Sequence, residues 1–259
     1  MKEKLRITLV QSDIFWNDAE ANISMFTEKI SNIKGSADLI ILPEMFSTGF
    51  MTKPQGVAEE IEGTTMQWMA RMAKEKDCVL TGSLIITEGG KYFNRLIWMK
   101  QDGTWEYYDK SHLFRMLGEH KFITKGTERK VIDIHGWKVL PLICYDLRFP
   151  VWARNRGDYD ILLCTASWPE RRSDVWKIML HARALENHVY AVGVNRVGKD
   201  GNGITYSGDS MVVNPKRQVI LDTSPGKDAV ETVELSYNDL QSVRNSFPAH
   251  LDADDFDLK

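Results

Sequence analysis

A reactive residue type stands at the end of one apolar run in this chain. Cys144 directly follows Val139–Ile143, a short branched run typical of a buried strand, and Pro150 favours the first turn of a helix just beyond it. A thiol at such a junction is held by rigid backbone beside N–H groups that can bind an oxyanion. The position therefore indicates a nucleophile, with a small buried apolar cysteine as the structural alternative.

An acid and an amine end two further apolar runs. Glu44 follows Leu39–Leu42 and a proline, and Lys110 ends the β-prone run Trp105–Asp109. Either charge alone is typical of a solvated surface. Together with Cys144, however, they supply what thiol chemistry needs, because a free thiol is mostly protonated at neutral pH. A carboxylate can take its proton and pass it to a departing amine, and a cation favours the thiolate and a developing oxyanion.

These segments resemble the nitrilase superfamily of carbon–nitrogen hydrolases. The resemblance covers nearly the whole chain in order, and three motifs carry it: Leu42-Pro43-Glu44, Asp109-Lys110 with His112-Leu113-Phe114, and Cys144-Tyr145-Asp146-Leu147-Arg148-Phe149-Pro150. It implies that Glu44, Lys110 and Cys144 are a catalytic triad. Cys144 would attack an amide carbon, ammonia would leave, and water activated by Glu44 would hydrolyse the thioester.

Further residues are expected to assist this chemistry. The resemblance implies a second glutamate after the lysine, which positions the lysine and the substrate, and Glu119 matches it best. The backbone N–H of Tyr145, next to the nucleophile, is the natural partner of the lysine in an oxyanion site. Asp146 and Arg148 are expected to brace the nucleophile turn as an ion pair. A Cys–His dyad is disfavoured, because the glutamate and the lysine already account for thiol activation.

The substrate pocket is expected along a loop that follows another strand. In the segment Thr165–Arg172, Trp168 could form a pocket wall. Arg171 or Arg172 could bind a substrate carboxylate in bidentate fashion, with a capping loop of solvated arginines as the alternative. Phe50 is a further residue expected to contact the substrate.

Three segments resemble the omega-amidase branch of the superfamily: Met45–Phe50, Thr165–Arg172 and Gly193–Gly198. The resemblance implies hydrolysis of the terminal amide of small 2-oxo-dicarboxylate monoamides, such as 2-oxoglutaramate and 2-oxosuccinamate, to the 2-oxo acid and ammonia. One alternative is another hydrolase of the superfamily, namely an N-carbamoyl amino acid hydrolase, an aliphatic amidase or a nitrilase. The other is a non-catalytic nitrilase-like binding module, which the presence of all three catalytic residue types argues against.

Composition restricts the partners and the compartment. The 259 residues hold 33 Lys and Arg against 36 Asp and Glu, a net charge of −3 without a basic stripe, so we expect no nucleic-acid partner. The three cysteines, Cys78, Cys144 and Cys164, are odd in number and far apart, which favours a reducing cytoplasm. Because the sequence has no zinc pattern and no apolar stretch near the ~18 residues of a membrane helix, we expect no metal, no cofactor and no membrane partner.

Strand and helix patterns alternate along the chain and predict an α/β fold with mixed sheets. Helices are expected from Asn17 or Asp18, from Gly63 and over 174–186, and hairpins at Asp102-Gly103 and His135-Gly136. The resemblance implies something more definite, an α-β-β-α four-layer sandwich that dimerises into an eight-layer sandwich. Residues 1–245 are expected to form a single carbon–nitrogen hydrolase domain, and residues 246–259 a polar C-terminal tail.

Overall fold

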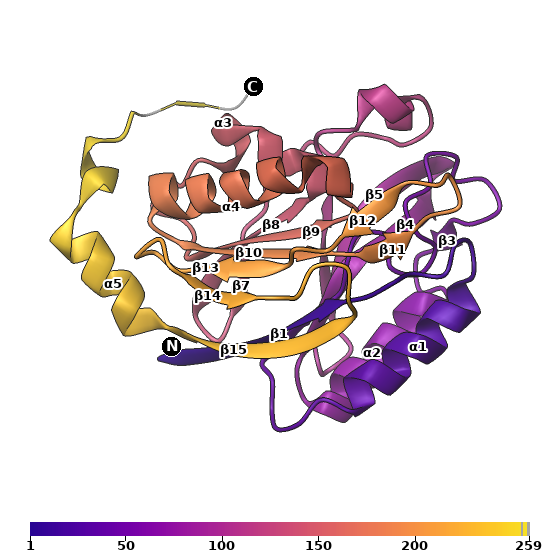
Figure 1. Ribbon diagram of the computed structural model, residues 1–259, viewed down its shortest axis with the longest axis horizontal. Coiled ribbons are helices and arrows are strands. Elements are labelled where there is room, and N and C mark those ends of the chain that lie inside the picture. The colour runs from indigo at the N-terminus through magenta and orange to yellow at the C-terminus, as the bar shows by residue number, and fades with distance from the viewer. Residues whose placement is uncertain (255, 258–259) are drawn as a thin grey trace.

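Two β-sheets form the centre of the molecule, and helices cover the outer face of each (Figure 1). The computed structural model describes residues 1–254, 256 and 257. The first sheet has the order β15 (Ala229–Ser236), β1 (Lys4–Gln11), β2 (Leu39–Ile41), β4 (Val79–Glu88), β5 (Lys91–Met99) and β6 (Trp105–Asp109), with β3 (Glu59–Glu60) paired to β4. The second has the order β14 (Val219–Asp222), β13 (Met211–Val213), β10 (Tyr190–Asn195), β9 (Ile161–Ala166), β8 (Trp137–Ile143) and β7 (Ile132–Ile134).

The remaining elements are helices and one separate hairpin, β11 (Val197–Lys199) with β12 (Thr205–Ser207). Helices α1 (Ala19–Ser31) and α2 (Thr64–Lys76) cover the first sheet, α3 (Pro150–Ala153) and α4 (Ser173–Asn187) cover the second, and α5 (Tyr237–Ser246) follows β15. Short 3-10 turns span Arg115–Leu117, Glu119–Lys121, Cys144–Arg148, Glu170–Arg172 and Ala249–Asp252. Within the described part of the chain, no helix combines the length and the apolar character needed to cross a bilayer.

Side-chain alternation along the strands produces three hydrophobic layers. Leu5 and Ile7 of β1 face the core between the sheets, where Val139 of β8 meets them. Val10 of β1 faces α1 and α2, and Leu140 of β8 faces the core under α3 and α4. Complete burial of such a side chain contributes about 1.5–3 kcal/mol. The three layers confirm the expected α-β-β-α sandwich.

Local signals in the sequence account for several turns. The Asp18 carboxylate accepts a hydrogen bond from the Ala21 N–H at 2.9 Å and so caps α1, as one of the two expected residues. Gly103 and Gly136 have φ values of +84° and +91° in the antiparallel hairpins β5–β6 and β7–β8. These left-handed conformations favour glycine, which explains why both hairpins could be predicted. Pro150 is the first residue of α3, also as expected.

The carboxyl ends of several parallel strands meet at one edge of each sheet. Strands β2 and β4 are parallel, and β6 has the same direction because two antiparallel pairings separate it from β4. Strands β8, β9 and β10 are parallel in the second sheet. Glu44 and Lys110 follow strands of the first sheet, and Cys144 and Ser167 follow strands of the second. Ligands of open α/β sheets bind beyond such strand ends.

The C-terminal part of the chain contains a helix that the sequence pattern does not predict. Helix α5 begins after Ser236, whose hydroxyl accepts from the Asp239 N–H at 3.2 Å, and it continues to Ser246. The expected domain boundary after residue 245 therefore falls inside its last turn. The expected polar tail, 246–259, includes residues 255, 258 and 259, which lie outside the described residues, so this division of the chain stays a prediction.

Candidate active site

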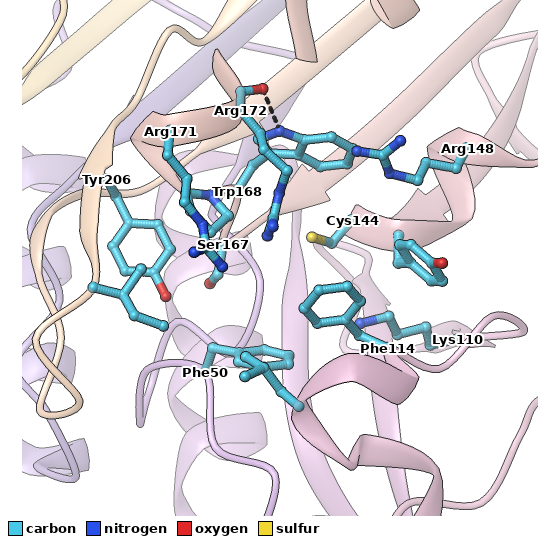
Figure 2. A pocket seen from close by; sticks show the side chains of 14 residues that line it. Phe50, Lys110, Phe114, Cys144, Arg148, Ser167, Trp168, Arg171, Arg172 and Tyr206 are labelled. Carbon is cyan, nitrogen blue, oxygen red and sulfur yellow. Dashed lines mark hydrogen bonds between the residues drawn. The ribbon is translucent and has the colours of Figure 1, made fainter. Parts of the chain in front are cut away.

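Cys144 occupies a strained turn at the end of β8. Its φ of +46° lies in the left-handed region, which costs a residue with a Cβ on the order of 1–3 kcal/mol. The residue begins the 3-10 turn Cys144–Arg148, and the first N–H groups of such a turn have no partner within it. The N–H of Tyr145 is one of these groups. Figure 2 shows the Cys144 sulfur facing a cavity, so the strained turn presents both a thiol and a donor to the same space.

Asp146 braces the nucleophile turn, but not through Arg148. Its buried carboxylate accepts hydrogen bonds from the Ile143 N–H at 3.1 Å and the Tyr108 hydroxyl at 2.8 Å. The backbone N–H of His112 donates to it at 2.8 Å. The guanidinium carbon of Arg148 lies instead 5.1 Å from the centre of the Trp168 ring, which lines the cavity. The expected ion pair is wrong, because backbone and tyrosine donors occupy the carboxylate and the arginine packs on an aromatic face.

This arrangement predicts that two substitutions change the free energy of unfolding by unequal amounts. Asp146→Ala should lower the free energy of unfolding by about 2–4 kcal/mol, because it leaves several buried donors without an acceptor. Arg148→Met should change it by less than about 1 kcal/mol, since the lost contact is a cation–π interaction. Urea unfolding of both variants checks this. A comparable loss in both would favour the ion pair after all.

Three charged side chains meet beside the thiol in complete burial. Lys110 Nζ lies 2.8 Å from Glu44 Oε1, and 3.1 and 3.0 Å from Oε1 and Oε2 of Glu119. None of the three side chains is exposed to solvent. The Glu44 Oε2 atom accepts a hydrogen bond from the Ser167 N–H at 2.9 Å. Burying two carboxylates around one ammonium is costly, and such clusters are characteristic of functional sites.

The neighbouring backbone fixes Lys110 and Glu119 in these positions. Arg95 forms a bidentate pair with Asp109 at 2.7 and 2.9 Å, which holds the end of β6 directly before Lys110. The loop that carries Glu119 returns over this strand end at Gly126, whose N–H donates to the Lys110 carbonyl at 2.9 Å. A Cβ at Gly126 would lie 2.1 Å from the Asp109 carbonyl oxygen, so only glycine permits this close approach.

The charges shift one another's pKa. Burial alone would lower the pKa of Lys110, but the carboxylates of Glu119 and Glu44 raise it above its usual value, so the amine stays protonated. Burial raises the pKa of Glu119, against the opposing effect of Lys110. Burial, and next the charge of Glu44, raise the pKa of the Cys144 thiol well above normal, and Lys110 only partly offsets this. The expectation that the lysine favours a thiolate is therefore outweighed in the free protein.

The raised pKa of Cys144 predicts how its alkylation depends on pH. At pH values well below the pKa of a thiol, its thiolate fraction rises about tenfold per pH unit. The rate of Cys144 modification by iodoacetamide should therefore rise about tenfold per unit between pH 7 and 9. Mass spectrometry of the Cys144 peptide measures this rate. The Cys144→Ala variant controls for the buried Cys78 and Cys164. A rate that levels off near pH 7 would mean that the thiolate already exists there.

Cys144 opens into a cavity that is continuous with solvent. Lys110 and Ser167 line it beside the thiol, and its other walls are aromatic, aliphatic and cationic. These further lining residues are Phe50, Phe114, Leu117, Tyr145, Arg148, Trp168, Pro169, Arg171, Arg172, Ile204 and Tyr206. Glu44 and Glu119 are not among the lining residues, although both contact Lys110, which is. Among the described residues, no group of three or more His, Cys, Asp or Glu side chains is arranged to hold a metal ion.

Three guanidinium groups crowd one side of this cavity. Arg148, Arg171 and Arg172 all line it, and within the described residues none of them has a carboxylate within salt-bridge distance. Figure 2 shows Arg171 and Arg172 extending from one loop into the cavity. Burial, together with the positive charges of Arg171 and Arg148, lowers the pKa of Arg172. Uncompensated cations in a partly buried cavity favour an anionic ligand.

Comparison with known proteins now identifies the family. The family model described as carbon-nitrogen hydrolase matches residues 6–245. The chain belongs to the carbon-nitrogen hydrolase family. It is 42% identical over 255 residues to the omega-amidase YafV of Escherichia coli, covering 98% of each chain, and 28% identical to the 2-oxoglutaramate amidase of Bacillus subtilis, covering 95% of this chain and 96% of that one.

A solved structure extends the similarity to the whole fold. The crystal structure of a carbon-nitrogen hydrolase superfamily protein from Xanthomonas campestris, with an arsenic adduct in its active site, superposes with a TM-score of 0.97. It is 39% identical and covers 100% of both chains. The family membership confirms the resemblance to the nitrilase superfamily, and the protein is an enzyme of the carbon–nitrogen hydrolase type.

The fold of this carbon-nitrogen hydrolase brings all the predicted site residues together. Glu44, Lys110 and Glu119 are in direct contact, and the other predicted residues share the cavity with the lysine: Cys144, Tyr145, Trp168, Arg171, Arg172 and Phe50. The catalytic roles of these residues stay predictions.

Other residues of the site were not singled out from the sequence. The sequence predicts Arg148 in the nucleophile turn, whereas the structure places it at the cavity, four residues after Cys144. Tyr206 lies on β12, a strand too short to give a clear alternating pattern. Asn94 lies inside β5 and contacts both buried glutamates. An asparagine in the middle of the β-prone run Tyr92–Met99 is the signal in the sequence that could have drawn attention to it.

Proposed function

We propose that this carbon–nitrogen hydrolase is an omega-amidase, which hydrolyses the terminal amide of small 2-oxo-dicarboxylate monoamides such as 2-oxoglutaramate and 2-oxosuccinamate. The observation that carries the proposal is the set of three guanidinium groups without carboxylate partners, within the described residues, around the cavity that holds the thiol. A substrate with a carboxylate at one end and an amide at the other fits these two features. Similarity to an omega-amidase and to a 2-oxoglutaramate amidase supports the same substrate class.

In the proposed mechanism, Cys144 is the nucleophile and Glu44 the base. Burial raises the pKa of the thiol, so in this mechanism Glu44 takes its proton as sulfur attacks the amide carbon. The tetrahedral oxyanion accepts hydrogen bonds from the Lys110 ammonium and the Tyr145 N–H. Glu44 then returns the proton to the amide nitrogen, the C–N bond breaks, and ammonia leaves a thioester on Cys144.

The second half of the reaction reverses the roles of the same groups. Water attacks the thioester carbon while Glu44 takes one of its protons, and the C–S bond breaks to give the 2-oxo acid. The proton on Glu44 returns to the sulfur, which restores the free enzyme. Throughout, Glu119 holds Lys110 as a protonated donor through its two contacts of 3.1 and 3.0 Å.

Ammonia release from a substrate panel tests the proposal. The panel holds 2-oxoglutaramate, succinamate, an N-carbamoyl amino acid, butyramide and butyronitrile. We expect the highest kcat/KM for 2-oxoglutaramate, with butyramide lower by at least about 30-fold because it lacks the carboxylate. A preference for butyramide or the nitrile would contradict the role of the arginines, and a preference for the N-carbamoyl amino acid would move the assignment to that hydrolase class.

We also propose that the enzyme is a cytoplasmic homodimer. Ile178 and Leu185 of α4 and Val151 of α3 are exposed apolar side chains on the outer helical layer, which supports association of two copies there. Three free thiols, Cys78, Cys144 and Cys164, support a reducing compartment. Sedimentation velocity tests the first part, and a species of monomer mass at micromolar concentration would contradict it. Recovery of the protein outside the cytoplasmic fraction of its cells would contradict the second.

A further inference from the structure

A buried amide connects the two glutamates of the site. Asn94 of β5 is completely buried, and its Nδ2 lies 2.8 Å from Glu44 Oε1 and 3.4 Å from Glu119 Oε1. The orientation of the amide follows from its surroundings, because both neighbours are carboxylate oxygens and only the NH₂ group can donate to them. Asn94 thus bridges the same two oxygen atoms that the Lys110 ammonium bridges.

Strand pairing places the amide and the amine side by side. The Lys110 N–H donates to the Asn94 carbonyl at 2.9 Å, directly beyond the last paired residues of β5 and β6. The position of each residue is therefore set by the same backbone contact. The Asn94 Oδ1 atom is buried without a hydrogen-bond partner, within the residues that the structure describes. An unsatisfied buried acceptor destabilises the fold, so the side chain is useful here for its two N–H donors.

The remaining oxygen of Glu44 shares a backbone donor with the thiol. Glu44 Oε2 accepts from the Ser167 N–H at 2.9 Å, and the same N–H lowers the pKa of Cys144, which places it beside both groups. Oε1 is occupied by Lys110 and Asn94 together, at 2.8 Å each. If both donors left Oε1, the carboxylate could rotate and exchange its two oxygens.

We propose that Asn94 is a positioning residue that occupies Glu44 Oε1 and ties it to Glu119, so that Oε2 is the oxygen that exchanges a proton with Cys144. An amide suits this place because it donates without releasing a proton at any accessible pH. It also holds both carboxylates while Lys110 turns toward an oxyanion, since the ammonium must then give up one of its three contacts. The proposal rests on the proposed roles of Glu44 and Cys144, but not on the identity of the amide substrate.

The test is the pH dependence of kcat/KM in Asn94→Leu and Asn94→Asp, measured with the panel amide that the parent turns over fastest. Hydrogen bonds to a carboxylate favour its charged form, so their loss should move the acid limb of the profile to higher pH. The other titratable groups that face this site are Lys110, Glu119, Cys144 and Cys164, and the variants leave all of them in place. We expect a shift of about one pH unit and a loss of about 10²-fold in Asn94→Leu, and a larger shift in Asn94→Asp, which adds a third carboxyl.

A matched substitution separates positioning from packing. Thr81 is also completely buried and lies on the neighbouring strand β4. Its hydroxyl donates to the Ile97 carbonyl at 2.7 Å rather than to either glutamate. Thr81→Val should leave the acid limb unchanged whatever its effect on thermal unfolding. An unshifted limb in Asn94→Leu, or an equal shift in Thr81→Val, would overturn the proposal.

A second measurement needs no substrate. The pH dependence of Cys144 alkylation by iodoacetamide reports on proton transfer from the thiol, and we expect it to change in both Asn94 variants and not in Thr81→Val. If the parent hydrolyses none of the amides, the proposed function fails, while this measurement still decides the role of Asn94. Asn94→Asp has the shape of the parent side chain, so it can still be measured if Asn94→Leu does not fold.

Discussion

Replacement of Cys144 by alanine is expected to lower the rate of ammonia release from 2-oxoglutaramate by about 10⁵-fold or more. Loss of the nucleophile in a triad that acts as a unit removes the covalent route entirely, and other groups cannot substitute for it. The remaining oxyanion donors would support only slow direct attack by water. A coupled assay for ammonia, run at high enzyme concentration to detect the residual rate, checks the magnitude.

A second cysteine provides the matched control for this prediction. Cys78 is 3% exposed and packs in the core between the first sheet and its helices, far from the cavity. Cys78→Ala should retain activity and lose about 1 kcal/mol of unfolding free energy, which lowers the melting temperature by about 2–4 °C in a chain of this size. Cys144→Ala should show the reverse pattern. Activity that survives in Cys144→Ala would make this cysteine a packing residue.

The ends of the apolar strands were predictable because burial leaves a clear local pattern. Leu39–Ile41 and Val139–Ile143 are continuous apolar runs, and both lie in strands whose carboxyl ends approach the cavity. A residue that follows such a strand is placed by rigid backbone, so its type already indicates a role. This is why Glu44 and Cys144 could be chosen from the sequence.

Contacts that depend on strand register or on loop direction were not predictable. The place of Asn94 beside Lys110 requires the register of β5 against β6, which no local pattern specifies. Arg148 is as near in sequence to Asp146 as an ion pair needs, but the 3-10 turn directs it to the cavity. Tyr206 lies on β12 of the β11–β12 hairpin and lines the cavity, and a three-residue strand gives no period to detect.

Removal of one guanidinium group from the cavity should change substrate preference. Arg172 is half-buried, and its pKa is lowered by burial and by the adjacent Arg171 and Arg148, whereas Arg171 is exposed. Arg172 is therefore the arginine that gains most from a bound carboxylate. We expect Arg172→Gln to reduce kcat/KM for 2-oxoglutaramate by about 30- to 1,000-fold, the cost of removing one partner of a desolvated charge pair.

The neutral substrate in the same assay decides what the arginine does. Hydrolysis of butyramide, which has no carboxylate, should change by less than about threefold in Arg172→Gln, because the triad is intact. Arg171→Gln is the matched control from the same loop, and we expect a smaller loss on 2-oxoglutaramate since that side chain is exposed. Melting temperature should stay level or rise in Arg172→Gln, because a crowded positive charge is removed. If kcat/KM fell equally for both substrates, Arg172 would maintain the shape of the cavity rather than bind the carboxylate. If Arg171→Gln caused the larger loss on 2-oxoglutaramate, Arg171 would be the residue that binds the carboxylate.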